Sequence, residues 1–474
     1  MIYERSFLTG ISILLYLWKV AEFIYLYQIK EYRFDRIKST INEHSFLKIL
    51  YSFSLKMPAK KPRNAILLLL AIVASVDIYL IATFLPQMLS FIFLAFIPIY
   101  AFAVVSLCVY VTNILAHQKR QSIIAQAITK VHETKTIFIG ITGSYGKSST
   151  KEFLYQILSR QFITGKTQAN MNTDVGIALN VLQHLHEDTE YFIAEMGAYK
   201  IGEITNCCKI TPPTYAIITS IGNQHLDLFG SRENLINAKK ELLLAVPSNG
   251  TIILNRDIHD YEMLIKDTKA HIITFSTTQE ADVYATNILI KDTILSATIH
   301  TKNQQFEIRT HLIGVHNIAN ILPCITLALE LGIKTETIVK AIAYLDQIKG
   351  KLSQSTGINN TTILDDSYNS NESGFISAIQ TMEQFPHKKK YIISKGIPEL
   401  GKEKNDTYNR IISRIKSTSI ALLTTDTDFS SETNTQIFAS EQLLFDFVNK
   451  NSDSDTLILI EGRIHPSLKK RILK

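Results

Sequence analysis

Cysteine is scarce in this chain, whose 474 residues contain four, Cys108, Cys207, Cys208 and Cys324. They lack the paired spacing of a zinc site and are too few for a disulfide scaffold, so we expect a reducing, cytoplasmic setting for the soluble part. A strong excess of one charge is lacking as well, because the formal net charge is only +6 and is unevenly distributed. We therefore expect no nucleic-acid partner.

Charge is almost absent from residues 64–116, where Asp77 carries the only formal charge. Residues 65–85 and 89–115 are each long and apolar enough to cross a hydrocarbon core about 30 Å thick. The alternative is that residues 1–116 form the buried helical core of a soluble protein. A soluble core rarely needs two nearly charge-free spans in succession, so we predict transmembrane helices here.

A third and weaker membrane candidate, residues 7–27, contains Lys19 and Glu22. These two residues stand one helical turn apart and could pair with each other. Alternatively Lys19 pairs with Asp77, which is otherwise a functional-site candidate because it is an acid within a membrane span. The segment has no basic start and no small-residue cleavage site, which argues against a removable signal peptide.

The loop between the first and second apolar segments, residues 30–63, carries nine Lys and Arg residues against Glu31, Asp35 and Glu43. The positive-inside rule predicts that this loop is cytoplasmic. The sequence "HQKRQ" then marks the cytoplasmic exit of the last span. We therefore expect a membrane region, residues 1–135, in a multi-pass protein of the inner (cytoplasmic) membrane, with all later residues in the cytoplasm.

Beyond residue 135 short β-branched runs alternate with helical stretches. The expected strands are "TIFIGI", "YFIAEM", "YAIITSI", "GTIILN" and "HIITFS". Strands are also expected in residues 282–313, followed by the helix "NIANILPCITLALELGI". A second unit has the strands "TTILDDS", "KYIIS", "SIALLTT" and "DTLILIE". We predict a doubly wound α/β fold, with domains at residues 136–348 and 349–474.

The stretch "IFIGITGSYGKSST" combines a strand, a glycine-rich turn and the start of a helix. Backbone N–H groups and the positive end of the helix then surround one spot, which suits a phosphate. Gly143 and Gly146 allow the chain to turn close to a ligand. Lys147 supplies a charge for the terminal phosphates and Ser148 a hydroxyl for Mg²⁺. The strict pattern G-x-x-x-x-G-K-[ST] requires glycine where Ile141 stands, so the match is incomplete.

The motif "GITGSYGKSSTKE" resembles the ATP loop of the Mur ligase family, T-G-[ST]-x-G-K-[ST], and its trailing "TKE" is most similar to the branch that adds D-alanyl-D-alanine. Further blocks resemble the family in order: "NMNTDVGIAL", "AEMGA", "IGNQHLDLFGSRENLINAKKEL", "GVHNIANI", "ILDDSYNSNESGFISAI" and "GIPELGKE". The resemblance covers residues 136–465. It implies a P-loop-containing central domain and a Rossmann-like carboxy-terminal domain.

The resemblance also implies ATP and Mg²⁺ as cofactors and a set of site residues. The residues implied to bind ATP are Thr142, Gly143, Ser144, Tyr145, Gly146, Lys147, Ser148, Ser149, Asn317, Asn320, Lys351 and Asp366. The implied Mg²⁺ ligands are Ser148, Glu195, His225 and Lys239, the last being carbamoylated and fourteen residues after His225. The implied substrate-binding residues are Asn170, Asn172, Thr173, Tyr368, Asn369 and Asn371. Lys147, His225 and Lys239 are the implied catalytic residues.

Taken alone, several of these residues have plainer interpretations. An isolated His225 is usually structural, and a helical Lys239 is usually a solvent-facing charge, as we expect for its neighbour Lys240. Asp365 and Asp366 could simply cap the end of a strand; by resemblance, Asp366 is the member that faces the nucleotide. Only the match to the family's order and spacing favours the functional interpretations.

Two features depart from the family pattern. The family's Gly-Arg pair before the carboxy-terminal domain is replaced by Gly350 and Lys351, which keeps the charge but loses the two-pronged guanidinium. The membrane region stands where the family has its uridine-binding domain. The identity of the acceptor is therefore open.

The implied activity is that of an ATP-dependent, ADP-forming acid–amino-acid ligase that forms an acyl phosphate. It would add D-alanyl-D-alanine, or another amine, to a muramoyl-peptide carboxylate in peptidoglycan synthesis. A rival is a related ligase with a different acceptor, possibly linked to lipid, as the membrane region favours. A distant alternative is a transport or regulatory ATPase, which would leave Lys239 and "DDSYNSN" without a role.

Overall fold

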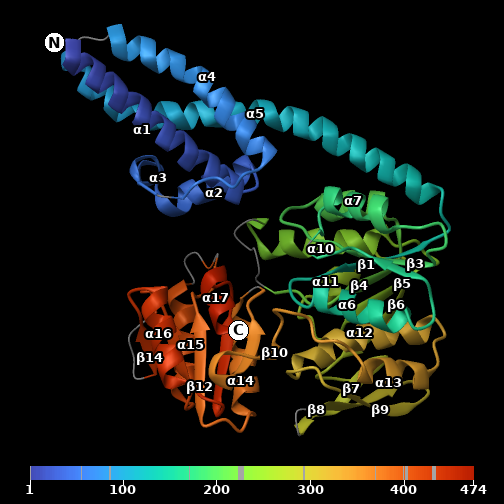
Figure 1. Ribbon diagram of the computed structural model, residues 1–474. Coiled ribbons are helices and arrows are strands. Elements are labelled where there is room, and N and C mark those ends of the chain that lie inside the picture. Colours follow the sequence, from blue (N-terminus) through green and yellow to red (C-terminus); the bar gives the residue numbers. More distant parts are fainter. Residues whose placement is uncertain are drawn as a thin grey trace. The chain divides into compact units, whose positions relative to one another are not determined.

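The computed structural model describes residues 2–54, 56–84, 87–169, 171–222, 229–291, 294–368, 370–398, 400, 404–429 and 434–473. Within these ranges it describes the backbone alone at residues 2–6, 43–44, 77–79, 82–84, 87–88 and 90–91. Three predicted site residues, Asn170, His225 and Asn369, lie outside the described residues, as do part of "GIPELGKE" and the side chain of Asp77. The chain divides into two compact units, residues 1–123 and 124–474, coloured along the sequence in Figure 1.

The amino-terminal unit contains helices and no strand over its described residues. Its helices are α1 (Ile2–Ile29), α2 (Phe34–His44), α3 (Phe46–Tyr51), α4 (Pro62–Phe84) and α5 (Gln87–His132), which continues into the second unit. The predicted apolar segments fall within α1, α4 and α5, except that residue 85 lies outside the described residues. The basic segment between the first two holds α2 and α3, two short helices that the apolar pattern did not predict.

Two described helices, Phe7–Ile29 and Ile92–His132, are long and apolar enough to cross a membrane, a test that the buried core helices of soluble proteins also pass. The apolar stretch Pro62–Val76 in α4 is shorter. Large apolar side chains point to solvent on these helices; Leu14, Val73 and Leu107 are 70%, 64% and 63% exposed. These observations leave the predicted number of spans open.

The polar pair inside α1 is satisfied locally. Lys19 is buried, and its Nζ lies 2.8 Å from Oε2 of Glu22, one turn along the helix. It also donates a hydrogen bond to the carbonyl oxygen of Ser52. The predicted pairing of Lys19 with Glu22 is thereby confirmed.

The first sheet of the second unit has nine strands in the order β2-β3-β1-β4-β5-β6-β7-β8-β9. The strands are β1 (Ile137–Thr142), β2 (Thr164–Lys166), β3 (Tyr191–Glu195), β4 (Pro213–Ile218), β5 (Thr251–Asn255), β6 (His271–Ser276), β7 (Val283–Lys291), β8 (Ile294–Thr301) and β9 (Gln305–Thr310). Strands β1 to β6 are parallel, whereas β7 to β9 form an antiparallel extension.

Helices cover both faces of the parallel part, with α6 and α12 on one side and α7 and α10 on the other (Figure 1). The helices of this domain are α6 (Lys147–Leu158), α7 (Asp174–His184), α8 (Glu203–Ile210), α10 (Arg232–Ala245), α11 (Tyr261–Ile265), α12 (His316–Glu330) and α13 (Thr335–Ala343). Because both faces are covered, β1 and β5 are buried almost throughout, which explains their continuous apolar sequences. The predicted doubly wound α/β fold is confirmed.

The second sheet has six strands in the order β10-β11-β15-β12-β13-β14. The strands are β10 (Ser353–Thr356), β11 (Thr362–Asp366), β12 (Lys389–Ser394), β13 (Ala421–Thr424), β14 (Thr435–Ile437) and β15 (Thr456–Glu461). The helices around them are η1 (Ile358–Asn360), α14 (Glu372–Glu383), α15 (Lys404–Lys416), α16 (Glu441–Asn451) and α17 (Pro466–Ile472). Its strands are parallel except for β10, which runs antiparallel to β11. Ligands of such sheets bind at the carboxyl ends of the strands.

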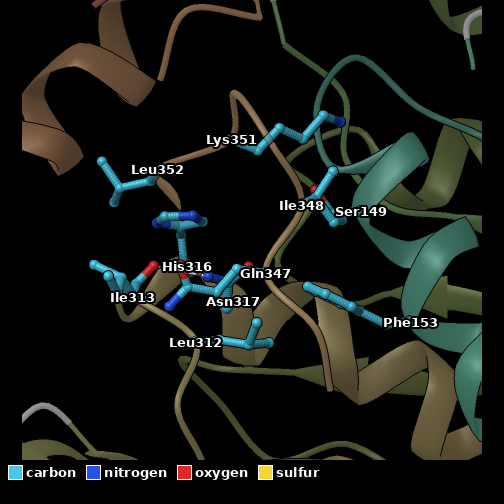
Figure 2. Close-up of a pocket in the computed structure, with 10 residues that line it drawn as sticks. All are labelled: Ser149, Phe153, Leu312, Ile313, His316, Asn317, Gln347, Ile348, Lys351 and Leu352. Atoms are coloured by element: carbon cyan, nitrogen blue, oxygen red, sulfur yellow. Dashed lines mark hydrogen bonds between the residues drawn. The ribbon is translucent and has the colours of Figure 1, made fainter. Parts of the chain in front are cut away.

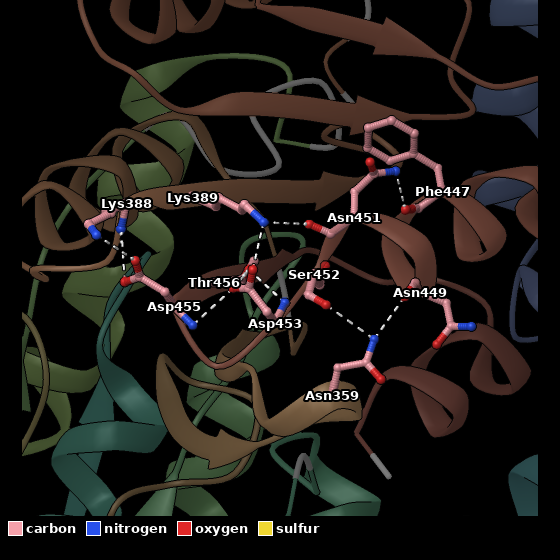
Figure 3. Close-up of polar contacts among 10 residues, drawn as sticks. All are labelled: Asn359, Lys388, Lys389, Phe447, Asn449, Asn451, Ser452, Asp453, Asp455 and Thr456. Carbon is pink, nitrogen blue, oxygen red and sulfur yellow. Dashed lines mark hydrogen bonds and ion pairs between the residues drawn. The ribbon is translucent and has the colours of Figure 1, made fainter.

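At the opposite edge of this second sheet, where β12 and β15 begin, charged and polar groups pair with one another (Figure 3). Lys389 Nζ lies 2.6 Å from Asp453 Oδ2, and the backbone N–H of Lys388 donates to Asp455 Oδ1 at 3.2 Å. The side-chain amide of Asn359 donates to the carbonyl oxygen of Asn449 at 2.8 Å. The charged groups at the amino edge of the sheet are thus paired within the protein.

Candidate active site

The glycine-rich turn between β1 and α6 packs so tightly that side chains are excluded at two positions. Gly143 and Gly146 have φ of 147° and 82°, in the left-handed region that glycine tolerates. A Cβ at Gly143 would lie 2.1 Å from Thr219 Oγ1, and one at Gly146 would lie 2.4 Å from Asn320 Oδ1. The turn therefore forms a close-fitting loop at the positive end of α6.

The segment that follows β4 fixes the conformation of this loop. The backbone N–H of Ser144 donates to the carbonyl oxygen of Ser220 at 2.8 Å, and the N–H of Tyr145 donates to Ser220 Oγ at 2.9 Å. The N–H of Gly222 donates to Ser144 Oγ at 2.9 Å. At the base of the loop, Thr142 donates its hydroxyl to the carbonyl oxygen of Met196 at 2.8 Å. The phosphate loop is thus held in place before any ligand binds.

Lys147, the first residue of α6, folds back over this loop. Its Nζ donates to the carbonyl oxygens of Gly143 at 2.6 Å and Ser144 at 3.0 Å. Burial lowers the pKa of Lys147, and the negative charge of Glu195 opposes that shift. A phosphate bound in the loop would offer this ammonium group a better partner than two neutral carbonyls.

Glu195, the last residue of β3, is 2% exposed and stands beside Ile141 of β1. Its Oε1 accepts a hydrogen bond from Asn172 Nδ2 at 3.1 Å, and its Oε2 lies 3.3 Å from Lys151 Nζ. Burial alone would raise the pKa of Glu195, but the charges of Lys151 and Lys147 hold it below its usual value. Among the described residues, Oε2 has no hydrogen-bond donor.

Lys239 lies on α10 and is only 4% exposed, so the plain expectation of a solvent-facing lysine does not hold. Its Nζ lies 6.0 Å from the ring centroid of Phe229 and makes no hydrogen bond or ion pair within the described part of the chain. Burial, reinforced by the charge of Lys147, lowers the pKa of Lys239 to about 7. The adjacent Lys240 pairs with Asp267 at 3.3 Å.

Lys351, just before β10, interacts with acidic residues at the strand ends of both sheets. Burial lowers its pKa to about 8, whereas the negative charges of Glu195 and Asp366 oppose the shift. Its Nζ lies 4.6 Å from the ring centroid of Tyr368, and both side chains line one hollow with Ser148 of the phosphate loop. Residues of both sheets therefore converge on one region.

A hollow of about 280 Å³ lies between α6, the start of α12 and the segment before β10. Figure 2 shows its lining, which is Ser149, Phe153, Leu312, Ile313, His316, Asn317, Gln347, Ile348, Lys351 and Leu352. Asn317 donates its side-chain amide to the carbonyl oxygen of Ile313 at 2.8 Å, and Asn320 lies deeper, against the phosphate loop. Of the two asparagines implied to bind ATP, only Asn317 therefore lines the hollow. Its apolar walls, from Phe153, Leu312 and Ile348, suit a flat base and were not predicted.

A larger hollow, of about 810 Å³, opens on another side of α6. Its lining is Ser148, Lys151, Glu152, Tyr155, Gln156, Lys166, Ala169, Asp346, Gln347, Ile348, Lys351 and Tyr368. Within it Lys166 pairs with Glu152 and lies 4.1 Å from the ring centroid of Tyr155. None of these three residues was predicted. Glu152 and Tyr155 follow a helical spacing with Ser148 and Lys151, a polar stripe on α6 that the sequence does show, whereas Lys166 ends β2.

The predicted substrate residues have mixed positions. Asn172 contacts Glu195, and Tyr368 lines the larger hollow. Thr173 and Asn371 cap helices α7 and α14, accepting hydrogen bonds from the N–H groups of Gly176 at 3.2 Å and Gly374 at 2.9 Å.

Asp366 sits where β11 ends and accepts a hydrogen bond from the N–H of Leu352 at 3.2 Å. Burial raises its pKa to about 7. Its neighbour Asp365 instead pairs with Lys469 at 2.9 Å. Asp366 is therefore the member of the pair on which the charge of Lys351 acts. That it faces the nucleotide stays a prediction.

The described residues contain no group of three or more His, Cys, Asp or Glu side chains that could hold a metal ion. The predicted ligand set of Ser148, Glu195, His225 and Lys239 relies on one residue outside the described ranges and on a modified lysine. Glu195 nonetheless fits a magnesium ion, because a buried carboxylate is a ligand of the kind that Mg²⁺ prefers. Its Oε2 accepts no hydrogen bond from the described residues and has only the ion pair with Lys151.

Residues 141–328 match the family model for the Mur ligase middle domain. A UDP-N-acetylmuramoyl-tripeptide–D-alanyl-D-alanine ligase from Buchnera aphidicola (subspecies Baizongia pistaciae) is 31% identical over 328 residues, which span 67% of this chain and 70% of the relative. The enzyme of that name from Escherichia coli is 32% identical over 269 residues, 56% of this chain and 59% of the relative.

Solved structures agree with the sequence matches. A crystal structure of MurF from Acinetobacter baumannii superposes with a TM-score of 0.68 at 25% identity and covers 75% of this chain and 80% of that one. The MurF ligase from Thermotoga maritima, solved in complex with ADP, has the same fold, with a TM-score of 0.67 at 21% identity over 74% of this chain and 82% of its own.

Proposed function

Because the chain belongs to the Mur ligase family, we propose that it joins a muramoyl-peptide carboxylate to the amine of D-alanyl-D-alanine. As a member of this family it is an ATP-dependent ligase that releases ADP. The two substrates are those named for its relatives. The product would be a peptide precursor for peptidoglycan synthesis.

One electrostatic observation carries this proposal. The charges of Lys151, Lys147 and Lys351 all act on Glu195, a single buried carboxylate. Glu152 also pairs with Lys151, and Asp366 acts on Lys351, but the hydrogen bonds of Lys147 go only to the neutral carbonyl groups of the loop. A buried ammonium group with such partners is unfavourable without an anion. A triphosphate together with a carboxylate substrate would supply that charge.

The chemistry follows from this arrangement. A carboxylate resists attack by an amine, because its charge repels the nucleophile and oxide is a poor leaving group. Transfer of the γ-phosphoryl group to the carboxylate gives an acyl phosphate, and attack by the amine then forms the amide and releases phosphate. Such a transfer depends mainly on positioning and on neutralising the phosphoryl oxygens. We assign the terminal phosphates to Lys147 and the backbone N–H groups of residues 146–148, at the start of α6.

We assign the base and ribose to the smaller hollow, beside Ser149 and Asn317 and near Lys351 and Asp366. The acceptor carboxylate is assigned to the larger hollow, which reaches Ser148 and contains Lys151 and Lys166. The two hollows share Gln347, Ile348 and Lys351, so their ligands would meet beside the phosphate loop.

Magnesium would be held by Ser148 and Glu195 at one position and by His225 and carbamoylated Lys239 at another. When bound, the ions would neutralise charge on the phosphoryl oxygens. The burial of Lys239, without an acceptor among the described residues, suits the conversion of its amine to a carbamate, because carbamate formation requires the uncharged amine. The role of His225 stays a prediction.

We propose as a second possibility that the acceptor is linked to lipid and that the protein is a multi-pass inner-membrane protein. The observation in favour is the exposure of large apolar side chains on α1, α4 and α5. A helical surface of this kind would be covered by acyl chains in a bilayer.

The test is ADP release by the full-length protein in detergent, measured with uridine-linked and with lipid-linked muramoyl tripeptide, each with and without D-alanyl-D-alanine. We expect release that requires both an acceptor and the amine, and that is lost in Lys147→Ala. Release that is independent of any acceptor would contradict the ligase function and would favour a transport or regulatory ATPase. The preferred acceptor decides between the two candidates.

A further inference from the structure

The segment that joins α1 to α4 in the amino-terminal unit is folded against the long helices. The inner side chains Ile37 of α2 and Leu50 of α3 are almost fully buried, in one apolar cluster with residues of α1, α4 and α5. The ring of Phe46 packs edge-on against Phe102 of α5, with the ring centroids 5.4 Å apart. The inner face of α2 and α3 is therefore fixed by the protein's own core.

The outer face of the same segment is apolar as well. Phe53 and Leu47 are 72% and 64% exposed. Together with three other exposed side chains they form what we call the apolar ridge: Phe46, Leu47, Tyr51, Phe53 and Met57. Because the inner face is already packed, the ridge is left for a contact outside the described chain.

The charges beside the apolar ridge are all positive. Residues 45–63 contain five Lys and Arg residues and no Asp or Glu. Four lysines of this stretch are exposed: Lys48, Lys56, Lys60 and Lys61. None of the four forms an ion pair with a described residue. The acids that precede the stretch have other partners, since Asp35 pairs with Arg33 at 2.6 Å and Glu31 with Arg36 at 3.2 Å. The four lysines are thus left for an anionic partner.

Side chains of the long helices satisfy backbone groups in the irregular part of the segment. The buried Lys19 of α1 donates a hydrogen bond to the carbonyl oxygen of Ser52. Gln28 of α1 accepts from the backbone N–H of Ala59 at 2.8 Å, and Asn64 of α4 donates to the carbonyl oxygen of Ala59 at 2.8 Å. Such partners matter most where water is scarce, because an unpaired backbone group is costly there.

We propose that the apolar ridge and the four lysines lie in the headgroup layer of a bilayer and favour anionic phospholipid. This inference goes beyond the ligase activity and rests on the proposal that the amino-terminal unit is embedded in a membrane. Aromatic side chains gather at membrane interfaces, and lysine stems extend along apolar surface while the ammonium group reaches the lipid phosphates. Clustered lysines beside a membrane attract lipids of negative charge.

The alternatives are a solvated loop, an interface without preference for lipid charge, and a contact with a second copy of the chain. A second copy fits this face less well than lipid does. In a twofold dimer the same surface of each copy would meet, which would bring the unpaired lysines of both copies together.

The test places one tryptophan on the apolar ridge of the full-length protein. Trp18→Phe removes the only native tryptophan, and Phe53→Trp supplies the probe. The protein is reconstituted in vesicles of seven parts phosphatidylcholine and three parts phosphatidylglycerol. Bromine on the acyl chains, which quenches tryptophan on contact, is carried either by the phosphatidylglycerol or by an equal amount of the phosphatidylcholine. Met57→Trp serves as the probe if Phe53→Trp does not fold.

We expect quenching of the probe at position 53 to be at least twofold stronger when the bromine is on phosphatidylglycerol. Joint replacement of Lys56, Lys60 and Lys61 by glutamine should make the two brominated lipids equal. Lys388→Gln, at an exposed lysine of the second unit, is the control and should leave the ratio unchanged. A probe at the exposed Val73 of α4, Val73→Trp, should be quenched equally by both lipids.

Equal quenching at position 53 by the two lipids in the presence of all four lysines would overturn the preference for anionic lipid. Absence of quenching at position 53, with strong quenching at position 73, would overturn the proposal in favour of a solvated loop or a second copy. Absence of quenching at both positions would instead contradict the membrane proposal on which this inference rests.

Discussion

Lys151 Nζ lies 3.3 Å from Glu195 Oε2, and both side chains are almost fully buried. The lysine thus lies beside Oε2, the oxygen of Glu195 that accepts no hydrogen bond from the described residues. Its Nζ also donates to the carbonyl oxygen of Ala169 at 3.0 Å, in the loop that leads to Asn172. Lys151 therefore links the candidate magnesium ligand to the loop that lines the larger hollow.

The first prediction concerns this ion pair. Lys151→Met should lower the free energy of unfolding by on the order of 3 kcal/mol in magnesium-free buffer, because it removes the ion-pair partner of the buried Glu195. Adding Mg²⁺ should stabilise the variant more than the wild type, since the ion would replace the missing cation. Thermal unfolding with and without Mg²⁺ measures both effects.

The control is Lys166→Met, which breaks the pair with Glu152 at a less buried place and should cost about 1 kcal/mol or less. Equal stability of Lys151→Met and wild type without magnesium would show that the pair does not hold Glu195 ionised.

A second prediction concerns Lys239. Lys239→Ala should lower kcat by on the order of 10²–10³-fold, because it removes a group assigned to stabilise the transferring phosphoryl. Added formate or acetate should restore part of the rate by standing in for the carbamate. Initial rates of ADP release at increasing formate measure the recovery.

Lys240→Ala is the matched control, since Lys240 is next in sequence and pairs with Asp267. It should keep its kcat and be indifferent to formate. Full activity of Lys239→Ala would remove this residue from the mechanism.

The third prediction concerns Lys351, which replaces the arginine of the family pattern. Lys351→Ala should raise the KM for ATP about 10-fold, because one charge-assisted hydrogen bond is worth roughly 1.5–3 kcal/mol. Lys351→Arg restores a two-pronged donor and should shift the KM for ATP downward. If both variants have the KM for ATP of the wild type, Lys351 does not contribute to ATP binding.

The fourth prediction is a pH dependence of stability. The pKa of Asp366 is raised to about 7, so between its unfolded value, about 4, and pH 7 the folded state binds more protons than the unfolded state. The stabilisation is therefore present at low pH and is lost as the pH rises through 7. Asp366→Asn should remove a fall of on the order of 2 kcal/mol between pH 4 and pH 8.

Urea unfolding at these two pH values measures the difference. Hydrogen bonds from Lys389 and Thr456 lower the pKa of Asp453, so this residue adds to the free energy of unfolding as the pH rises. Asp453→Asn should therefore remove a rise with pH, where Asp366→Asn removes a fall. The assignment would be contradicted if the free energy of unfolding changed by the same amount from pH 4 to pH 8 in the wild type and in Asp366→Asn.

The strands that could be predicted are those buried on both faces. β1, β3, β5 and β15 are apolar almost throughout, because helices cover the parallel sheet on both sides. β2, β10 and β14 were missed: their sequences "TGK", "SQST" and "TQI" are short and mostly polar or half-exposed. Their pairing with a neighbouring strand, rather than any apolar run, makes them strands.

The residues of the candidate site likewise fall into those that the sequence predicts and those that it does not. Lys147 and Glu195 could be predicted because a strand end and a glycine-rich turn place them at one sheet edge. Tyr155 and Lys166 could not, because their partnership depends on how α6 packs beside β2.

The central claim, that ATP activates a carboxylate for attack by an amine, is tested most directly with acceptor labelled by ¹⁸O in its terminal carboxylate. In a complete reaction with the full-length protein, mass spectrometry of the released phosphate should find one labelled oxygen for each amide formed, because the carboxylate oxygen that attacks the γ-phosphorus leaves with the phosphate. Phosphate that carries no label while amide accumulates would contradict the account.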